Sequence, residues 1–398
     1  MNALTTPRPL DGITVLALEH AVAAPVCTRH LADQGARVIK IERPGVGDFA
    51  RGYDRRVAGQ SSYFVWANRS KESLTLDVKH AQAQPILEAL LQRADVLVQN
   101  LAPGAAARLG LSYEALATKH PRLVVCDISG YGDDGPYRDK KAYDLMVQAE
   151  AGLLAATGSG DTIARAGFSA ADVSAGMYAY SSILAALLLR ERTGSGSRVD
   201  VAMLETLTEW MGNPMYYAFD GQPPAPRTGA SHPSIAPYGP LALDDGHVLL
   251  LGVQNEREWQ RFCAEVLDEP ALADDPRFAD NTQRTRHRAL LDERIAARFA
   301  GLNVEAAEAR LERAGIANAR VNSAAALWQH PQLQARRRWT EIATPAGPVP
   351  ALLPPGSSNR YTPRMDGVPA LGQHTSAVLD ELGYSSAQVD ALRTSGVV

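Results

Sequence analysis

The first 130 residues alternate between short apolar runs and amphipathic stretches. Apolar runs at 13–18, 38–41, 96–98 and 123–128 are separated by segments with helical features. Strands that alternate with helices in this way pair in parallel through right-handed crossovers. The sequence therefore predicts an α/β fold with a large Rossmann-like parallel sheet, in which ligands bind in the loops beyond the carboxyl ends of the strands.

Length and a change in sequence character predict more than one folding unit. A chain of 398 residues is too long for one compact core. A Pro-rich stretch at 222–227 precedes a hairpin pattern around Asp245-Gly246 and two amphipathic helices. We expect a large α/β domain over 1–200, a linker over 201–226, a small α+β domain over 227–325, and a segment over 326–398 that links back to the large domain.

Composition and missing motifs exclude several classes of function. The net charge of -4 argues against a nucleic-acid partner, and the three cysteines are too far apart for a disulfide framework or a zinc motif. The sequence has no P-loop, no nucleophile elbow, no dinucleotide fingerprint and no paired metal-binding histidines. The N-terminus lacks an apolar signal segment, and the most apolar run, 176–189, is shorter than a membrane span. We therefore expect a cytoplasmic protein without metal, nucleic-acid or membrane partners.

An acidic residue, Asp172, stands where a long apolar helix over 173–192 is expected to begin. Aspartate is among the best helix caps, so capping alone would account for its presence. A helix N-terminus also stabilises a carboxylate, and an ionised carboxylate can attack an acyl carbon. The two interpretations are compatible, and the residues alone leave both open.

Cationic and amide side chains recur near the expected carboxyl ends of strands. Arg43 follows the second apolar run, Lys71 precedes a further short strand, and Asn100 and Arg108 follow the third run. Each could belong to a solvated turn. Guanidinium and ammonium groups also stack on bases and pair with phosphates, so the set together favours a phosphate-bearing ligand.

Several segments, in this order, make the chain resemble the family III CoA-transferases, the group of formyl-CoA transferase and the carnitine CoA-transferase. The segments are Gly-Ala-Arg-Val-Ile-Lys-Ile-Glu-Arg-Pro-Gly at 35–45, Asn-Arg-Ser-Lys-Glu-Ser at 68–73, Ser-Gly-Tyr-Gly-x-x-Gly-Pro at 129–136, Ala-Tyr-Asp at 142–144, Asp172, and Leu-Arg-Glu-Arg-Thr-Gly-Ser-Gly at 189–196. The resemblance is strong over 10–210 and weaker over 225–330.

The resemblance implies a mechanism and a set of site residues. The family's acyl-accepting aspartate falls on Asp172, which would form first an aspartyl anhydride and then an aspartyl-CoA thioester. An active-site tyrosine falls on Tyr143, and the adenine-stacking arginine falls on Arg43. Further coenzyme A contacts fall on Lys71, Asn100, Arg108 and Lys141. Coenzyme A would be a co-substrate with no permanently bound cofactor, and the family fold implies an interlocked homodimer of ring-shaped chains.

Two departures from the formyl-CoA transferases bear on the substrate. Val22 stands at about the place of their first-loop glutamine, and the segment 228–239 replaces their run of glycines. The segments 19–25 and 255–259 look more like relatives that act on C4–C5 dicarboxylates. We therefore expect succinyl-CoA as the donor and itaconate, mesaconate or citramalate as the acceptor. A second carboxylate would need a cation, for which the candidates are Arg51, Arg55, Arg227 and His232.

Two other functions remain open. The α-methylacyl-CoA racemases also have an aspartate aligned with Asp172, but their second base is a histidine in a Gly-His-Asp run. This chain has Ala-Tyr143-Asp there, and the high ordinary pKa of tyrosine makes it a poor base at neutral pH. A catalytically silent CoA-binding protein would keep the same basic loops. The arginine run at 336–338 is more typical of a solvated or interdomain face than of a nucleic-acid site.

Overall fold

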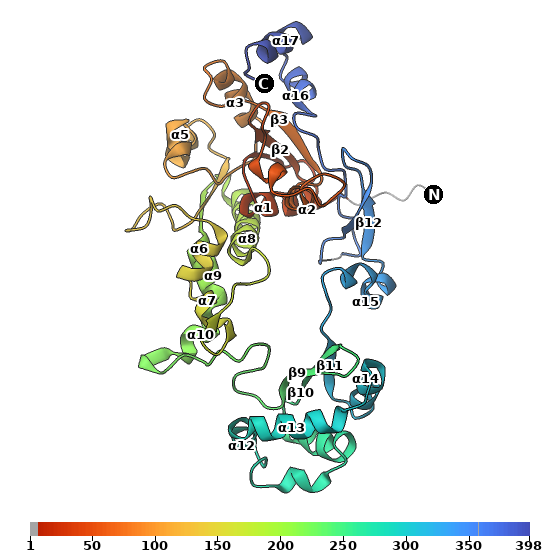
Figure 1. The fold of residues 1–398 in the computed structure, drawn as a ribbon. Helices are drawn as coiled ribbons and strands as arrows, with labels where there is room; N and C mark the ends of the chain where they lie inside the picture. Colours follow the sequence, from red (N-terminus) through yellow and green to blue (C-terminus); the bar gives the residue numbers. More distant parts are fainter. Residues whose placement is uncertain (1–6, 357) are drawn as a thin grey trace. The chain divides into compact units, whose positions relative to one another are not determined.

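Two compact units make up the described chain, residues 7–356 and 358–398 of a computed structural model (Figure 1). Unit 1 comprises the described residues up to Leu153 together with Arg165–Asn213 and Gln334–Val398. Unit 2 comprises Leu154–Ala164 and Pro214–Leu333. Each unit is therefore assembled from segments that lie far apart in the sequence.

A six-stranded parallel sheet forms the centre of unit 1, with the strand order β3-β2-β1-β4-β5-β8. The strands are β1 (Thr14–Leu18), β2 (Arg37–Glu42), β3 (Lys71–Thr75), β4 (Val96–Gln99), β5 (Val124–Ser129) and β8 (Arg198–Ala202). The predicted Rossmann-like sheet is confirmed. In this order β2 lies on one side of β1 and β4 on the other, so successive strands are first added on one side of β1 and then on the other. In open α/β sheets ligands bind beyond the carboxyl ends of the strands at such a point.

Helices cover both faces of this sheet (Figure 1). Alternate side chains of β1 divide between two cores, with Val15 and Ala17 in one and Leu16 and Leu18 in the other. Strands buried on both faces are near-continuous hydrophobic runs, which explains why they were readily located in the sequence. The helices of unit 1 are α1 (Ala23–Asp33), α2 (Ser62–Ala67), α3 (Ala83–Leu91), α4 (Ala105–Arg108), α5 (Tyr113–Ala117), α6 (Asp144–Glu150), α8 (Ala170–Thr193), α9 (Met203–Trp210), α16 (Thr375–Glu381) and α17 (Ser386–Thr394), with the 3-10 helix η1 (Phe49–Gly52) and the hairpin of β12 (Trp339–Ile342) and β13 (Val349–Leu352).

The long helix α8 packs against α1 at a position that only glycine fits. A Cβ atom on Gly176 would lie 2.7 Å from the carbonyl oxygen of Ala23, so the two backbones approach too closely for any side chain. Within the described residues, α8 is the helix whose length and composition would allow it to cross a membrane. Its Ala175, Ala179 and Ile183 lie in the same buried core as the sheet, as expected for a core helix.

Unit 2 contains a three-stranded antiparallel sheet in the order β11-β10-β9, covered by helices. Strands β9 (Tyr238–Ala242) and β10 (Val248–Gly252) form the hairpin predicted around Asp245-Gly246, and β11 is Ala317–Arg320. The helices are α11 (Glu256–Arg261), η3 (Phe262–Val266), η4 (Pro270–Asp274), α12 (Asn281–Arg286), α13 (Arg288–Phe299), α14 (Val304–Arg313), η2 (Phe219–Gly221) and η5 (Ala326–Gln329), and β6 (Gly158–Ser159) pairs with β7 (Thr162–Ile163). Helices α7 (Leu153–Ala156), α10 (Gly212–Tyr217) and α15 (Pro331–Ala335) span unit boundaries.

Two local predictions were wrong. The segment before the apolar run at 96–98 was expected to be helical over 77–94, but α3 begins only at Ala83, because residues 77–80 form a turn closed by a hydrogen bond from His80 N–H to Asp77 O. Lys71 does not lie near the carboxyl end of a strand; it is the first residue of β3. The hydrophobic pattern located both elements but did not fix where they start.

Candidate active site

Asp172 lies in the first turn of α8 and does not cap it, so the predicted capping role is wrong. Asp144 instead supplies the cap. Its Oδ1 accepts hydrogen bonds from the backbone N–H groups of Ala171 at 2.8 Å and Asp172 at 3.2 Å. Asp144 is itself held by the amide of the buried Gln148, which donates to its Oδ2 at 2.6 Å. The carboxyl group of Asp172 is thereby left without a hydrogen bond or ion pair from the described residues.

The ionisation of Asp172 is strongly perturbed. Burial, with a smaller contribution from the nearby Asp144 carboxylate, raises the pKa of Asp172 from 3.8 to about 7. The carboxylate was expected to be ionised at the helix N-terminus, and with a pKa of about 7 it is only partly ionised at neutral pH. A carboxyl that titrates near neutral pH, without a structural partner, is typical of a functional site.

Tyr143 immediately precedes α6 and is 70% exposed. Close backbone packing fixes the loop that carries it, because a Cβ on Gly130 would lie 2.1 Å from the Cβ of Ala142. Tyr53 is a neighbour that sequence reasoning missed: burial and the charges of Asp48 and then Asp172 raise the pKa of Tyr53 to about 12, with Tyr143 also in electrostatic range. Asp172, Tyr143 and Tyr53 thus share one region of unit 1.

Aromatic rings form a continuous row that includes Tyr53. The ring centroid of Tyr53 lies 5.7 Å from that of Phe49, and the Phe49 ring stacks on His20 at a centroid distance of 5.4 Å. Tyr63 packs edge-on against Tyr53 at a centroid distance of 5.3 Å. Phe49 and Tyr53 are both nearly half exposed. The row leads from the surroundings of Asp172 to the loop after β1, and no local sequence pattern signals it, because its members come from three separate segments.

Asn100 joins the two loops that follow β1 and β4. Its Oδ1 accepts a hydrogen bond from His20 N–H at 2.9 Å, and its Nδ2 donates to His20 O at 2.9 Å. The amide of Asn100 therefore holds the loop after β1 in place. Val22, next in this loop, is buried at the start of α1 and packs against Val26 and Ala67.

A buried ion network lies beneath the same loop. The ammonium of Lys71 donates to Glu19 Oε1 at 2.7 Å, Pro25 O at 3.0 Å and Asn68 Oδ1 at 3.0 Å, which uses all three of its hydrogens. Lys40 bonds Glu19 Oε1 at 3.3 Å and Asp48 at 2.8 Å.

The contacts of the buried ion network shift the pKa values of Glu19 and Lys71. Although burial opposes ionisation, Lys40 and Lys71 lower the pKa of Glu19 to about 2. Burial lowers the pKa of Lys71 to about 8 against the attraction of Glu19. Lys71 thus has an internal role in this structure.

The other predicted site cations fall into two groups. Arg43, directly after β2, Arg108, at the end of α4, and Lys141, just before Tyr143, are exposed and make no side-chain hydrogen bond or ion pair with described residues. Arg51 is occupied: it makes two 2.8 Å hydrogen bonds to the buried Glu42 and lies 3.7 Å from the ring centroid of Phe64. Free cations suit a diffusible anionic ligand, whereas Arg51 has a partner already.

The remaining candidates for a second carboxylate include two residues of unit 2. Arg227 donates to Gly160 O at 2.8 Å and Ala155 O at 3.0 Å, and His232 stacks on Tyr238 at 5.4 Å. Arg55 bonds Gly59 O at 3.4 Å on the surface of unit 1. Each has a structural contact, and their role toward a substrate stays a prediction.

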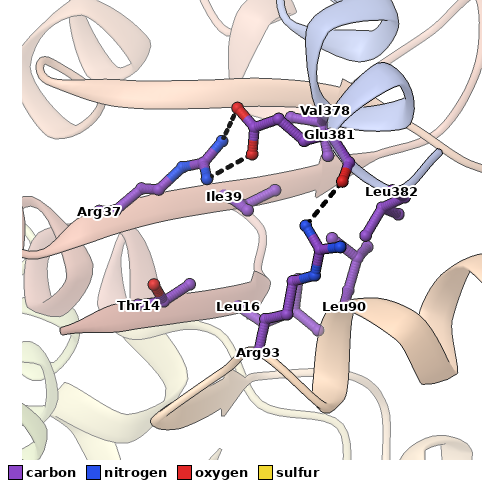
Figure 2. A pocket seen from close by; sticks show the side chains of 9 residues that line it. All are labelled: Thr14, Leu16, Arg37, Ile39, Leu90, Arg93, Val378, Glu381 and Leu382. Carbon is purple, nitrogen blue, oxygen red and sulfur yellow. Dashed lines mark hydrogen bonds and ion pairs between the residues drawn. The ribbon is translucent and has the colours of Figure 1, made fainter. Parts of the chain in front are cut away.

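A small cavity of about 30 Å³ lies at the opposite end of the sheet, where β1 and β2 begin (Figure 2). Thr14 and Arg37 line it from the strands, and Arg37 and Arg93 both bond Glu381 of α16. This space holds about one water molecule, so it is no substrate site. Among the described residues, no cluster of His, Cys, Asp and Glu could hold a metal ion.

Comparisons with known proteins point the same way as the site. The family model described as CoA-transferase family III matches residues 10–375. The chain is 34% identical to a succinyl-CoA:glutarate CoA-transferase of Mus musculus over 98% of this chain and 90% of that protein. It is 40% identical to an acetyl-CoA:oxalate CoA-transferase of Acetobacter aceti over 70% of this chain and 73% of that protein. The crystal structure of a CAIB/BAIF family protein from Brucella suis matches with a TM-score of 0.84 and 32% identity, covering 94% of this chain and 100% of that one.

Proposed function

The chain belongs to CoA-transferase family III, and we propose that it moves coenzyme A from succinyl-CoA to a C4–C5 dicarboxylic acid through covalent intermediates on Asp172. The observation that carries this proposal is the unpaired carboxyl of Asp172, whose pKa is raised to about 7. A surface carboxylate is well solvated and a poor nucleophile, whereas a desolvated one loses less solvation when it attacks an acyl carbon.

The chemistry proceeds by carboxylate and thiolate exchanges without net proton transfer. Ionised Asp172 attacks the carbonyl carbon of succinyl-CoA, the C–S bond breaks, and coenzyme A leaves as a thiolate from the resulting anhydride. The thiolate attacks the aspartyl carbonyl, succinate departs, and an aspartyl-CoA thioester remains. The acceptor carboxylate attacks this thioester, the C–S bond breaks, and a second anhydride forms with release of the coenzyme A thiolate. The thiolate then attacks the acceptor's carbonyl, which gives the new acyl-CoA and restores Asp172.

Coenzyme A is the co-substrate, and the three free cations suit its phosphates and adenine. Arg43 stacks on the adenine, as the resemblance implies, and Arg108 and Lys141 pair with phosphate oxygens. Asn100 and Lys71 support the loop after β1 through the hydrogen bonds they already make. This division of roles assigns ligand contacts to the side chains that lack other partners.

The acceptor is a C4–C5 dicarboxylate, with itaconate, mesaconate and citramalate as the candidates from the sequence. Support comes from the Mus musculus relative, whose name pairs succinyl-CoA with glutarate, a C5 dicarboxylate. Oxalate is the second candidate, because the Acetobacter aceti relative that accepts it by name has 40% identity to this chain. Val22, where the formyl-CoA transferases have a glutamine, favours the longer acids.

The working form is an interlocked homodimer in the cytoplasm. Large apolar side chains of unit 2 are exposed along one continuous segment: Met215 at 55%, Tyr216 at 80% and Phe219 at 69%. Contiguous exposed groups of this kind mark an interaction surface, and a second copy of the chain would cover them. All three cysteines are free and buried, which suits a reducing compartment.

The test is a substrate panel followed by mass spectrometry of the acyl-CoA species. Succinyl-CoA is incubated with glutarate, itaconate, mesaconate, citramalate and oxalate, using the wild type, Asp172→Ala and the exposed control Asp139→Ala. We expect transfer to a C4–C5 acid, abolished in Asp172→Ala and retained in the control. Transfer to oxalate alone supports the second candidate. Deuterium exchange at the α-carbon without transfer indicates a racemase, and binding without turnover a silent protein.

A further inference from the structure

His20 is a half-buried residue of the loop after β1 that the proposed mechanism does not use. It follows Glu19 after β1, and its ring stacks on Phe49 with an interplanar angle of 27°. Its Nδ1 is enclosed by protein and has no hydrogen-bond partner, and no described residue bonds its Nε2. Because Nδ1 is enclosed, Nε2 is the nitrogen of this ring that a ligand can reach.

The position of the His20 ring is fixed from several sides. The side chain of Asn100 takes both the backbone N–H and the carbonyl of His20. The next residue, Ala21, has a φ of 60°, a left-handed conformation rare for alanine, and its N–H donates to Asp48 Oδ1 at 3.1 Å. Asp48 is fixed in turn by the buried Lys40. A strained backbone held by side chains from two neighbouring loops is typical of a functional site.

The ring is a neutral hydrogen-bond donor. Burial, together with Lys40 and Arg43, lowers the pKa of His20 against the attraction of Asp48, so the imidazole is uncharged at neutral pH. A neutral imidazole carries one ring proton. On the enclosed Nδ1 this proton would have no acceptor, so it resides on Nε2. The immobilised ring therefore presents one N–H group, a donor suited to a carbonyl oxygen.

The location of His20 identifies the part of the ligand that it meets. Arg43, the expected adenine contact, lies within electrostatic range of His20. In the other direction, Phe49 leads to Tyr53, which is in range of Asp172 and Tyr143. His20 thus lies between the nucleotide end and the reacting end of the site. In an acyl-CoA, that stretch is the pantetheine arm, which carries two amide carbonyls.

We propose that His20 Nε2 donates a hydrogen bond to an amide carbonyl of the pantetheine arm and so directs the thioester toward Asp172. The inference rests on the proposed function, because it assumes that coenzyme A is the ligand. His20 is a binding residue in this scheme. It takes no part in bond making, and it contributes to affinity for coenzyme A but not for a ligand that ends at the phosphates.

Calorimetric binding of coenzyme A and ADP tests this assignment, because ADP lacks the pantetheine arm. His20→Phe keeps the ring stacking but removes the donor, and His247→Phe, on the exposed hairpin turn of unit 2, is the control. We expect His20→Phe to weaken coenzyme A binding about threefold to tenfold, the usual value of one hydrogen bond, with ADP affinity unchanged. Unchanged ADP affinity also shows that the variant is folded.

The outcomes separate this inference from the proposed function. Equal loss of coenzyme A and ADP affinity in His20→Phe, or no loss of either, overturns the pantetheine assignment while leaving CoA transfer intact. A wild-type protein that binds no coenzyme A overturns the proposed function itself. The kinetic counterpart is a raised KM for succinyl-CoA with an unchanged KM for the acceptor acid, and a change in the acceptor KM alone contradicts the inference.

Discussion

Replacing Asp144 by asparagine removes the negative charge of this residue while keeping its cap on α8. The asparagine Oδ1 can still accept the hydrogen bonds from Ala171 and Asp172, although the bond from Gln148 to Oδ2 is lost together with the charge. Since the Asp144 charge is the second cause of the raised pKa of Asp172, after burial, its removal lowers that pKa. Burial remains, so the carboxyl stays less acidic than an ordinary aspartate.

The size of the effect follows from the ranking of the two causes. The pKa of Asp172 is raised from 3.8 to about 7, and Asp144 accounts for less than half of that shift because burial is the larger cause. We therefore expect the midpoint to fall by about one pH unit, equivalent to about 1.4 kcal/mol. Only the ionised carboxylate attacks the thioester, so the variant should react about tenfold faster than the wild type well below both midpoints.

The assay is the pH dependence of kcat/KM for succinyl-CoA, which reports the ionisation of the free enzyme. The wild-type value should fall tenfold per pH unit below pH 7 and level off above it. Asp144→Asn should shift this curve to lower pH, whereas the exposed control Asp139→Asn should not. A wild-type midpoint below pH 5, or an Asp144→Asn curve that does not move, would refute the electrostatic account of Asp172.

Three further predictions concern stability and binding. The pKa of Asp172 is higher in the folded state than its ordinary 3.8, so the ionised carboxyl destabilises the fold increasingly as the pH rises from 4 to 7. At pH 8 the free energy of unfolding of Asp172→Asn should exceed that of the wild type by about 2 kcal/mol, half the ceiling of about 4 kcal/mol because the side chain is partly exposed. Thermal melts of the two proteins below pH 4 should coincide. Glu19→Gln deprives the buried ammonium groups of Lys40 and Lys71 of the carboxylate that they share. Urea unfolding should show a free energy of unfolding lower by about 3–5 kcal/mol, and an unchanged value would contradict the buried network. Arg43→Ala should weaken coenzyme A binding at an unchanged Tm. Arg51→Ala should lower the Tm, because it leaves the buried Glu42 without its ion pair. The reverse pattern would reject the division into free and occupied cations.

Periodicity and motif order predicted the elements that depend on local sequence. The strands of the parallel sheet are buried runs, and the hairpin at Asp245-Gly246 has its own turn signal, so both were found. The start of β3 at Lys71 and of α3 at Ala83 were missed, because strand pairing and a local turn decide them.

The site shows the same division between local and spatial information. Asp172 was located because a helix start and a family pattern coincide there. Its capping partner Asp144, 28 residues earlier, was not, because only the folded chain brings the two together. His20 and Tyr53 were missed for the same reason: a ring stack built from separate loops leaves no periodic pattern in the sequence.

The central claim is that Asp172 carries the transferred group, and the mass of the protein during turnover tests it most directly. Wild-type protein is mixed with succinyl-CoA without an acceptor acid, quenched in acid, digested and examined by peptide mass spectrometry, with hydroxylamine treatment in parallel. We expect a coenzyme A thioester on the peptide that contains Asp172, converted by hydroxylamine to a hydroxamate at that residue and absent from Asp172→Ala. Transfer activity without any adduct at Asp172, or full activity in Asp172→Ala, would contradict it.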